Sequence, residues 1–526
     1  MKRTKSGGLL LGVNAFEVKR YLMKSENYCT VPLPAYYDFG GILREMEKRN
    51  RRGRLMELCV KDLRKYEGVN YRLAVSKNAQ EYSQREFRIM HPLVYVEMVR
   101  IFVENWERMQ ARFSLFEKQG TVICASVTPG LISQKKVAAS SIMRWWSGIE
   151  QMTMKMAIYY NVMAETDIQD CYGSMDLRIL ERAIGGGVGE RLAEILASSE
   201  KGNYVGMPQG AVLTDFLAEA ILGYIDVVFD NEVRRQRVKG EYTVVRFRDD
   251  YRMFAENETT VRKLLKILAE VLARFEMKLN ATKTAVSDDI IARARKEDKS
   301  YWETRQGMVV GAQPDSGDVV ARGGEVGYGV RELGLQRQLL MIYDLARRYP
   351  NSGSVQKALF ELYERKIYNL EHRTGDLYAM LGIVMEMMIR NPRTVQVCIA
   401  IMTKLMSFNP GISRKSLASN IMLKMQTRPT TDYVEIWVQR LTVKQKPGKK
   451  YQNLMSQMVY DQRVKIWNSE WVGFKVLDYT VVNHAVIQEM EFVIPVEEVK
   501  LFSEYRTGGL VEDGEDDAWG SFDAKE

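Results

Sequence analysis

YTVVRFRDDYRMFA, residues 242–255, holds two short apolar runs that flank a pair of adjacent aspartates, Asp249 and Asp250. β-Branched and aromatic residues dominate both runs, which predicts two strands of a hairpin with the carboxylates at its tip. Two negative charges side by side on a rigid turn are unfavourable unless a cation neutralises them, and divalent ions held by oxygen ligands commonly do so. An Asp-Asp pair alone is more typical of a solvated turn, so the metal-site interpretation depends on the rest of the chain.

The composition is that of a globular protein long enough for several domains, with 526 residues of which 46% are hydrophobic. The net charge is +9 although the segment from Val511 onward is strongly acidic, so the remaining residues form a basic body that suits a polyanionic partner. Five cysteines without Cys-x-x-Cys spacing argue against a disulfide framework or a zinc site. No segment is apolar enough to span a membrane, so we expect a cytoplasmic protein that does not associate with membranes.

Three further blocks accompany the hairpin. TDIQDCY (166–172) places Asp167 at the end of an expected strand, with Tyr172 five residues later. GMPQG (206–210) is a tight turn before an apolar helix that we expect to begin near Ala211. LNATKT (279–284) carries Lys283 close to a strand edge.

Upstream of these blocks, residues 71–109 predict a strand pair followed by an amphipathic helix that begins near Leu93. Lys77 and Arg85 lie just before that helix, where cations either grip a triphosphate or form ordinary surface charge. We interpret His91, at the expected helix entry, as a structural residue and not as a ligand.

Beyond the glycine-rich stretch 307–329 the chain is expected to be almost purely helical. Pro350, Pro392 and Pro429 recur at spacings of 42 and 37 residues, each before a polar residue and an apolar helix. This period is close to that of stacked helix pairs of the HEAT kind, and an irregular helical bundle is the alternative.

The order and spacing of the aspartate blocks resemble the palm of a reverse transcriptase over roughly residues 70–290. TDIQDCY resembles motif A, GMPQG motif B, FRDDY motif C and LNATKT motif D. The resemblance implies nucleotidyl transfer with two Mg²⁺ ions, or Mn²⁺ as the alternative, and dNTPs with RNA or DNA as partners. It assigns metal binding to Asp167, Asp249, Asp250 and the Ile168 carbonyl, triphosphate contact to Lys283, Lys77 and Arg85, and nucleotide positioning to Pro208, Gln209 and Gly210.

Two positions refine the resemblance. Tyr172 stands where RNA-dependent RNA polymerases carry a second aspartate, and in reverse transcriptases an aromatic there excludes the ribose 2′-hydroxyl. The motif departs from the usual Tyr-x-Asp-Asp pattern, because it is Phe-Arg-Asp-Asp here, with Arg248 at the position that approaches the primer end. We therefore expect a DNA product, with Arg248 near the nucleotide and the primer end.

The segments around this palm point to a subgroup. A ribonuclease H-like carboxylate set and a His-rich endonuclease region are missing from the sequence, whereas the RIMHP block and the helical C-terminal region are similar to bacterial abortive-infection and unknown-group reverse transcriptases. That group acts in antiphage defence; some members attach DNA covalently to a tyrosine or use a noncoding RNA. The alternatives are a retron-like or intron-derived enzyme that copies a dedicated noncoding RNA, and a catalytically silent nucleic-acid-binding scaffold. Template, primer and homo-oligomerisation stay open.

We therefore expect an α+β chain in which a right-hand fingers and palm domain precedes an all-α, HEAT-like region. The division is an N-terminal helical extension (1–70), fingers and palm (71–295), a Gly-rich connector (296–330), a helical repeat domain in place of a thumb (331–505) and an acidic disordered tail (506–526).

Overall fold

The computed structural model describes residues 13–50, 53, 63–76, 84–118, 122–124, 150–310, 334–373, 375–426, 431–445, 451–472 and 481–499. Several predicted features lie outside these residues: Lys77, Pro429, most of the glycine-rich connector and the acidic tail. In the part of the chain that is described, no helix has the length and apolar character that a membrane span requires.

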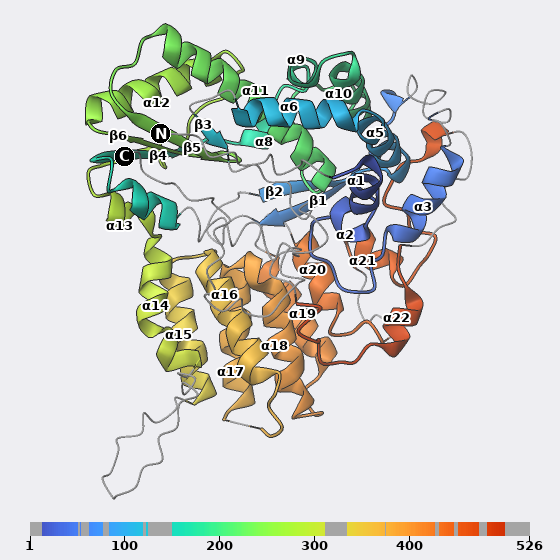
Figure 1. Ribbon diagram of the computed structural model, residues 1–526. Helices are drawn as coiled ribbons and strands as arrows, with labels where there is room; N and C mark the ends of the chain where they lie inside the picture. The colour runs from blue at the N-terminus through green and yellow to red at the C-terminus, as the bar shows by residue number, and fades with distance from the viewer. Residues whose placement is uncertain are drawn as a thin grey trace, which may run out of the picture.

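A five-stranded sheet in the order β3-β5-β6-β4-β7 forms the palm (Figure 1). The hairpin predicted from the sequence is present as β5 (Tyr242–Phe247) and β6 (Asp250–Ala255). β4 (Val162–Asp167) pairs antiparallel with β6 and with β7 (Ala285–Ser287), and β3 (Val122–Cys124) runs parallel to β5.

The two faces of this sheet are covered differently because successive side chains of a strand point to opposite sides. α11 (Val212–Arg235) and α12 (Glu258–Ala273) pack on the face that carries Val244 and Met253. On the other face, Phe247 and Phe254 belong to a smaller core whose further members are Met152, Met156, Tyr160, Met163, Val245 and Ile290.

The fingers hairpin lies between the palm and the lower helical lobe (Figure 1). β1 (Tyr71–Ser76) pairs antiparallel with β2 (Gln84–Ile89), and α5 (Pro92–Glu104) follows, as predicted. His91 caps this helix, since its Nδ1 accepts a hydrogen bond from the Leu93 amide at 3.2 Å. The predicted amphipathic character of α5 is wrong, because almost every side chain from Pro92 to Phe102 is buried.

Shorter helices surround the fingers and palm. The glycines at 185–187 have positive φ and separate two of these helices. The bounds are α1 Ala15–Leu22, α2 Ser25–Tyr28, α3 Gly40–Arg49, α6 Trp106–Lys118, α8 Cys171–Ser174, α9 Ile179–Ile184, α10 Val188–Ser199 and α13 Ile290–Ala294.

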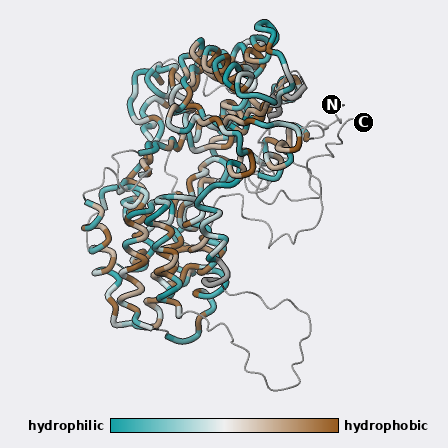
Figure 2. The backbone as a smooth tube through the Cα atoms, turned by 90° about the vertical axis from the view of Figure 1, so that its left-hand side faces the viewer, coloured by the Kyte–Doolittle hydropathy of each residue, from teal (hydrophilic) through white to brown (hydrophobic). Residues whose placement is uncertain are grey.

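A stack of helices forms the lower lobe, and apolar segments recur along its helices (Figure 2). Most helices contact the next helix along the chain and the next but one, and Pro350 and Pro392 lie at the turns that join successive helices. The elements are α14 Glu297–Val310, α15 Leu335–Arg348, α16 Gly353–Leu362, η2 Tyr363–Ile367, α17 Leu377–Arg390, η3 Pro392–Thr394, α18 Val395–Ser407, α19 Arg414–Met425 and α20 Asp432–Gln439. Because α14 is helical to Val310, the connector expected to begin at residue 296 begins later.

The expectation of nearly pure helix is wrong after α20. Residues 451–472 and 481–499 contain only α21 (Leu454–Met458), η4 (Glu470–Val472) and α22 (His484–Glu489). This segment packs back on the fingers, where the Trp467 indole donates to the Ile89 carbonyl at 3.0 Å.

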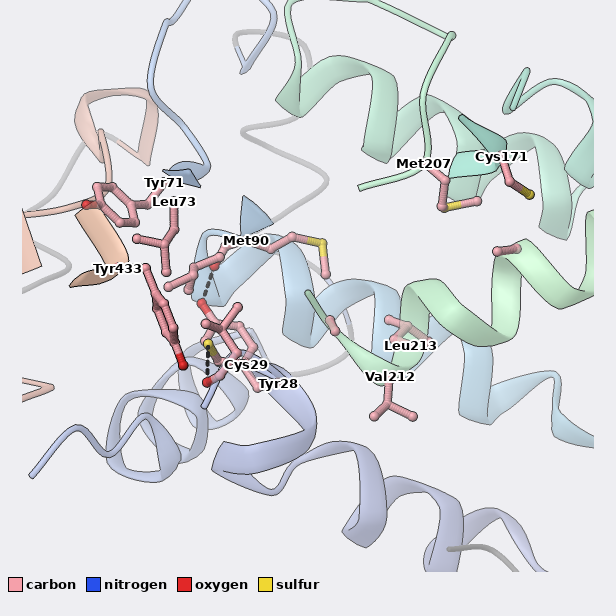
Figure 3. Close-up of a cluster of buried hydrophobic side chains, with 14 of the residues drawn as sticks. Tyr28, Cys29, Tyr71, Leu73, Met90, Cys171, Met207, Val212, Leu213 and Tyr433 are labelled. Atoms are coloured by element: carbon pink, nitrogen blue, oxygen red, sulfur yellow. Dashed lines mark hydrogen bonds between the residues drawn. The ribbon is translucent and has the colours of Figure 1, made fainter. Parts of the chain in front are cut away.

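One continuous core joins the N-terminal helices, the fingers, α11 and the helical lobe. Figure 3 shows Tyr28 beside Met90 at the end of the fingers hairpin, with Leu213 of α11 and Tyr433 of α20 in the same cluster. The Tyr28 hydroxyl donates to the Met90 carbonyl inside this cluster. The fingers are therefore fixed from both ends of the chain.

Candidate active site

The predicted carboxylates meet at one end of the palm sheet. Asp250 opens β6 and is paired in register with Asp167, the last residue of β4, so the two side chains stand on the same face. Asp249 lies in the two-residue turn of the β5–β6 hairpin, and its carbonyl accepts the Ile168 amide at 3.1 Å. Arg248, the other turn residue, has φ +51°, a conformation that tight hairpin turns require.

Lys283 approaches the same carboxylates from the segment before β7. Its ammonium contacts Asp167 Oδ2 at 2.5 Å, and the Asn280 amide donates to the Asp167 carbonyl at 2.8 Å. The other carboxylate oxygen, Asp167 Oδ1, is buried and has no hydrogen-bond partner among the described residues. A buried carboxylate oxygen without a donor is costly unless a cation approaches it.

Burial and mutual repulsion perturb the two hairpin aspartates. Burial, and after it the charge of the neighbouring Asp249, raise the pKa of Asp250 to about 6, while Lys296 acts in the opposite direction. The pKa of Asp249 is also raised, by burial and by the charge of Asp167. Both raised pKa values arise because negative charges lie close together where water solvates them poorly. A bound cation would reduce this repulsion.

The donor set fits a hard divalent cation. Three carboxylates from adjacent strands, one with an unpartnered buried oxygen, offer the oxygen ligands that Mg²⁺ prefers. Among the residues that the structure describes, no group of three His, Cys, Asp or Glu side chains is gathered tightly enough to form a ready-made metal cage. The fit rests on the chemistry of the donors and on Asp167 Oδ1.

The Pro-Gln-Gly turn joins the palm to the fingers. The Gln209 carbonyl accepts the Arg88 amide of β2 at 2.6 Å, and the Gly210 carbonyl accepts the Thr30 amide at 2.9 Å. Gly210 has φ +121°, and a Cβ at this position would lie 3.1 Å from the Arg88 carbonyl oxygen. Glycine is therefore required both by the backbone conformation and by the close approach of β2.

Tyr172 lies where α11 meets the hairpin turn. Its hydroxyl donates to Asp215 Oδ1 at 2.8 Å, and its carbonyl accepts the Met207 amide at 2.7 Å. Asp215 Oδ2 also faces the Arg248 guanidinium at 3.4 Å. Asp215 thus contacts two residues predicted to bind nucleotide, although the sequence analysis did not single it out.

A buried arginine below the turn was also missed. Arg246 of β5 is fully buried and pairs with Glu219 and Asp226 of α11, at 2.7 Å in each case. Arg246 also donates to the Arg248 carbonyl at 3.0 Å, and the Tyr251 hydroxyl donates to Asp226. A signal was available in the sequence, because a charged residue inside an apolar strand facing an apolar helix with two carboxylates indicates a buried ion pair.

Three further cations lie in a series that starts beside the carboxylates, in which the charge of Lys296 interacts with Asp250 and Arg393, and that of Arg393 with Arg85. Lys296 lies close enough to Asp250 to affect its pKa, and Arg85 of β2 is exposed. Arg393 of η3 reaches the solvent. Partial burial of its side chain and the charge of Arg85 both lower its pKa. No carboxylate lies within salt-bridge distance of Arg85 or Arg393 in the described part of the chain.

The structure thus brings Asp167, Asp249, Asp250 and Lys283 together as predicted and joins Tyr172 to Arg248 through Asp215. Pro208, Gln209 and Gly210 contact the fingers, and Arg85 neighbours Arg393 of the helical lobe. Lys77 lies outside the described residues.

The palm region matches one family of known proteins. Telomerase from Candida albicans, in a structure with a TWJ fragment of telomeric RNA, matches at 11% identity over 73% of this chain and 68% of that chain, with a TM-score of 0.25. No curated protein matches the chain. Residues 118–307, which contain all five palm strands and the aspartates, match the family model of reverse transcriptases (RNA-dependent DNA polymerases), so this part of the chain is a reverse transcriptase domain.

Proposed function

We propose that this protein adds dNTPs to a growing DNA strand by two-metal-ion nucleotidyl transfer at Asp167, Asp249 and Asp250. The observation that carries the proposal is the pairing of Asp167 with Asp250 at the strand ends, with Asp167 Oδ1 buried and unpartnered. A structural ion pair would satisfy both oxygens of Asp167. Asp167 Oδ1 has no partner and lies near two further carboxylates, an arrangement suited to a metal ion that binds reversibly.

Each group has a distinct task in this mechanism. Asp167, Asp249 and Asp250, with the Ile168 carbonyl, would hold two Mg²⁺ ions, which supply charge for activating the primer hydroxyl and stabilising the pyrophosphate. Lys283 neutralises Asp167 in the structure and can turn to the triphosphate, because its side chain is 65% exposed. Arg85 and Arg393 attract the phosphates of the nucleotide or of the template strand.

In this proposal, nucleotide selection depends on the Pro-Gln-Gly turn and on Tyr172. Gln209 and the neighbouring Pro208 and Gly210 hold a rigid backbone turn against β2, so a base pair can stack beside it in one position. In this proposal the Tyr172 ring excludes the ribose 2′-hydroxyl, as an aromatic at this place in motif A does in reverse transcriptases, and deoxyribonucleotides are favoured.

The biological role belongs to the proposal as well. The RIMHP block and the stacked helices of the lower lobe support a bacterial cytoplasmic antiphage enzyme of the abortive-infection kind, with HEAT-like helix pairs in place of a thumb. We propose the same domain boundaries as expected from the sequence, with the connector beginning after α14. Copying of a dedicated noncoding RNA is the rival function, and synthesis primed on a tyrosine is an additional possibility within the main proposal.

The test is incorporation of labelled dNTPs and NTPs by the purified protein with Mg²⁺ on RNA and DNA templates. The double variant Asp249→Asn/Asp250→Asn should lose activity by at least about 10³-fold, because oxygen donors of the ions are neutralised. Asp288→Asn is the matched control, since Asp288 belongs to an exposed Asp-Asp pair before α13 and should retain full activity.

The products also separate the alternatives. Migration that changes on protease treatment indicates DNA attached to the protein, whereas copurified RNA of one defined sequence favours the dedicated-template function. Nucleic acid binding without any aspartate-dependent synthesis would refute the enzyme proposal and leave a scaffold.

A further inference from the structure

We infer that Asp215 is a specificity-determining positioning residue that fixes Tyr172 and the hairpin turn relative to each other, and so sets the discrimination between deoxyribose and ribose. This inference rests on the proposed function and deepens it. It concerns a carboxylate in the first turn of α11 that belongs to none of the motif residues of the resemblance.

The contact with Tyr172 is directional. The hydroxyl donates to Asp215 Oδ1 at 2.8 Å. Burial and the neighbouring Asp215 both raise the pKa of Tyr172 well above its usual value, so the phenol remains a hydrogen-bond donor at any working pH. A hydrogen bond to a charged acceptor restricts the ring to one rotamer, and the rotamer decides how much room the sugar has.

The second contact ties the same carboxylate to the catalytic hairpin. Asp215 Oδ2 faces the Arg248 guanidinium at 3.4 Å, and the Arg248 carbonyl is held from below by Arg246. Arg248 is followed directly by Asp249. The Asp215 carboxylate therefore contacts both Tyr172, which is proposed to exclude the ribose hydroxyl, and the turn that carries Asp249.

This arrangement gives the unusual Arg248 a role. In the Phe-Arg-Asp-Asp motif, Arg248 fills the variable position of the turn, and an arginine with positive φ carries backbone strain. Its guanidinium gives Asp215 a charged partner at this position. A shift of Asp215 then moves Tyr172 and the turn together.

The experiment measures selectivity and not rate alone. The kcat/KM ratio for a dNTP over the matching NTP is determined for wild type, Asp215→Asn, Asp215→Ala and Tyr172→Phe, together with the KM and kcat of each. Loss of a hydrogen bond to a charged group should lower the ratio about tenfold in Asp215→Ala, with a smaller loss in Asp215→Asn. Asp176→Asn is the control expected to leave the ratio unchanged, because Asp176 is a half-buried aspartate that pairs with the exposed Arg178.

A double-mutant cycle identifies the route. If Asp215 acts through the Tyr172 hydroxyl, Asp215→Asn combined with Tyr172→Phe should lower the ratio no further than the stronger single variant. A purely structural role would reduce dNTP and NTP incorporation by the same factor and leave the ratio in place, which would overturn the inference.

A measurement of nucleotide binding tests the inference without relying on DNA synthesis. Competition between labelled dTTP and UTP is measured in the Asp249→Asn/Asp250→Asn background, with and without Asp215→Ala. A narrowed preference for dTTP supports the inference even where the polymerase proposal fails, and an unchanged preference overturns it.

Discussion

Arg246→Met is the substitution that most directly tests how the catalytic turn is supported. Arg246 is fully buried, and its guanidinium contacts Glu219 and Asp226 at 2.7 Å and the Arg248 carbonyl at 3.0 Å. Methionine retains much of the side-chain volume but removes every one of these contacts. Two buried carboxylates of α11 are then left without their cation.

The magnitude follows from that unpaired charge. Removing one partner of a buried ion pair costs about 3–5 kcal/mol, since the remaining charge stays in a dry environment. Burial already raises the pKa of Asp226 to about 6 in spite of the attraction of Arg246, so the carboxylate has little solvation to fall back on. We expect Arg246→Met to lower the stability of the palm by about that amount.

Thermal unfolding followed by calorimetry or by circular dichroism measures the effect. In a folding unit of 150–250 residues each kcal/mol shifts the Tm by about 2–4 °C, so the palm transition should fall by at least about 6 °C. Arg262→Met is the control, because the Arg262–Glu258 pair on α12 is exposed on both sides and such pairs contribute about 0–1 kcal/mol.

A compensated variant separates charge from packing. Arg246→Met combined with Glu219→Gln and Asp226→Asn removes the unpaired charges and should recover a large part of the lost stability. Polymerase activity should remain low in both variants, because the Arg248 carbonyl has lost its donor. A Tm shift in Arg246→Met no larger than in Arg262→Met would refute the reasoning.

Two further predictions concern the contacts that hold the fingers. Burial lowers the pKa of His91 to about 3, whereas the unfolded chain binds this proton below about pH 6.5. The neutral imidazole therefore contributes fully to stability above about pH 6.5, and the free energy of unfolding falls by about 2 kcal/mol between pH 7 and pH 5. His91→Gln should remove this component from the Tm-versus-pH curve; Asp226 titrates in the opposite sense in both proteins and cancels in the comparison, and identical curves would contradict the prediction. Gly210→Ala should destabilise by about 1–3 kcal/mol and raise the KM for dNTPs, because alanine is strained at this φ and meets the Arg88 carbonyl. Gly353→Ala, where a Cβ meets nothing within 4 Å, is the control, and an equal response of the two alanine variants would contradict the steric argument.

Local patterns in the sequence were sufficient to predict the palm. The β-branched and aromatic runs in residues 242–255 predicted both strands and the turn between them. These features depend on neighbours in sequence, so composition and period determine them. The resemblance to a palm predicted that Asp167, Asp249 and Asp250 share one site, and the strand register places Asp167 opposite Asp250.

Contacts between segments that are distant in sequence could not be predicted from local patterns. Asp215 carries no local signal, because a carboxylate in the first turn of a helix is common for electrostatic reasons alone. Its role emerges only where α11 meets both Tyr172 and Arg248. The burial of α5 has the same origin, since a helix covered from several sides loses the polar face on which an amphipathic prediction depends.

The support of the fingers shows how these long-range contacts determine function. β2 is held at Arg88 by the Gln209 carbonyl of the palm turn and at Ile89 by the Trp467 indole of the C-terminal segment. Because adjacent residues of one strand are fixed from the palm and from the C-terminal segment, β2 cannot move without breaking one of these contacts. His91 adds a third, through Ser469 at 3.1 Å and the faces of Trp467 and Trp471. The segment after α20 therefore acts as a brace for the fingers, and any motion that admits a nucleotide must either carry this segment along or bend the hairpin beyond Arg85.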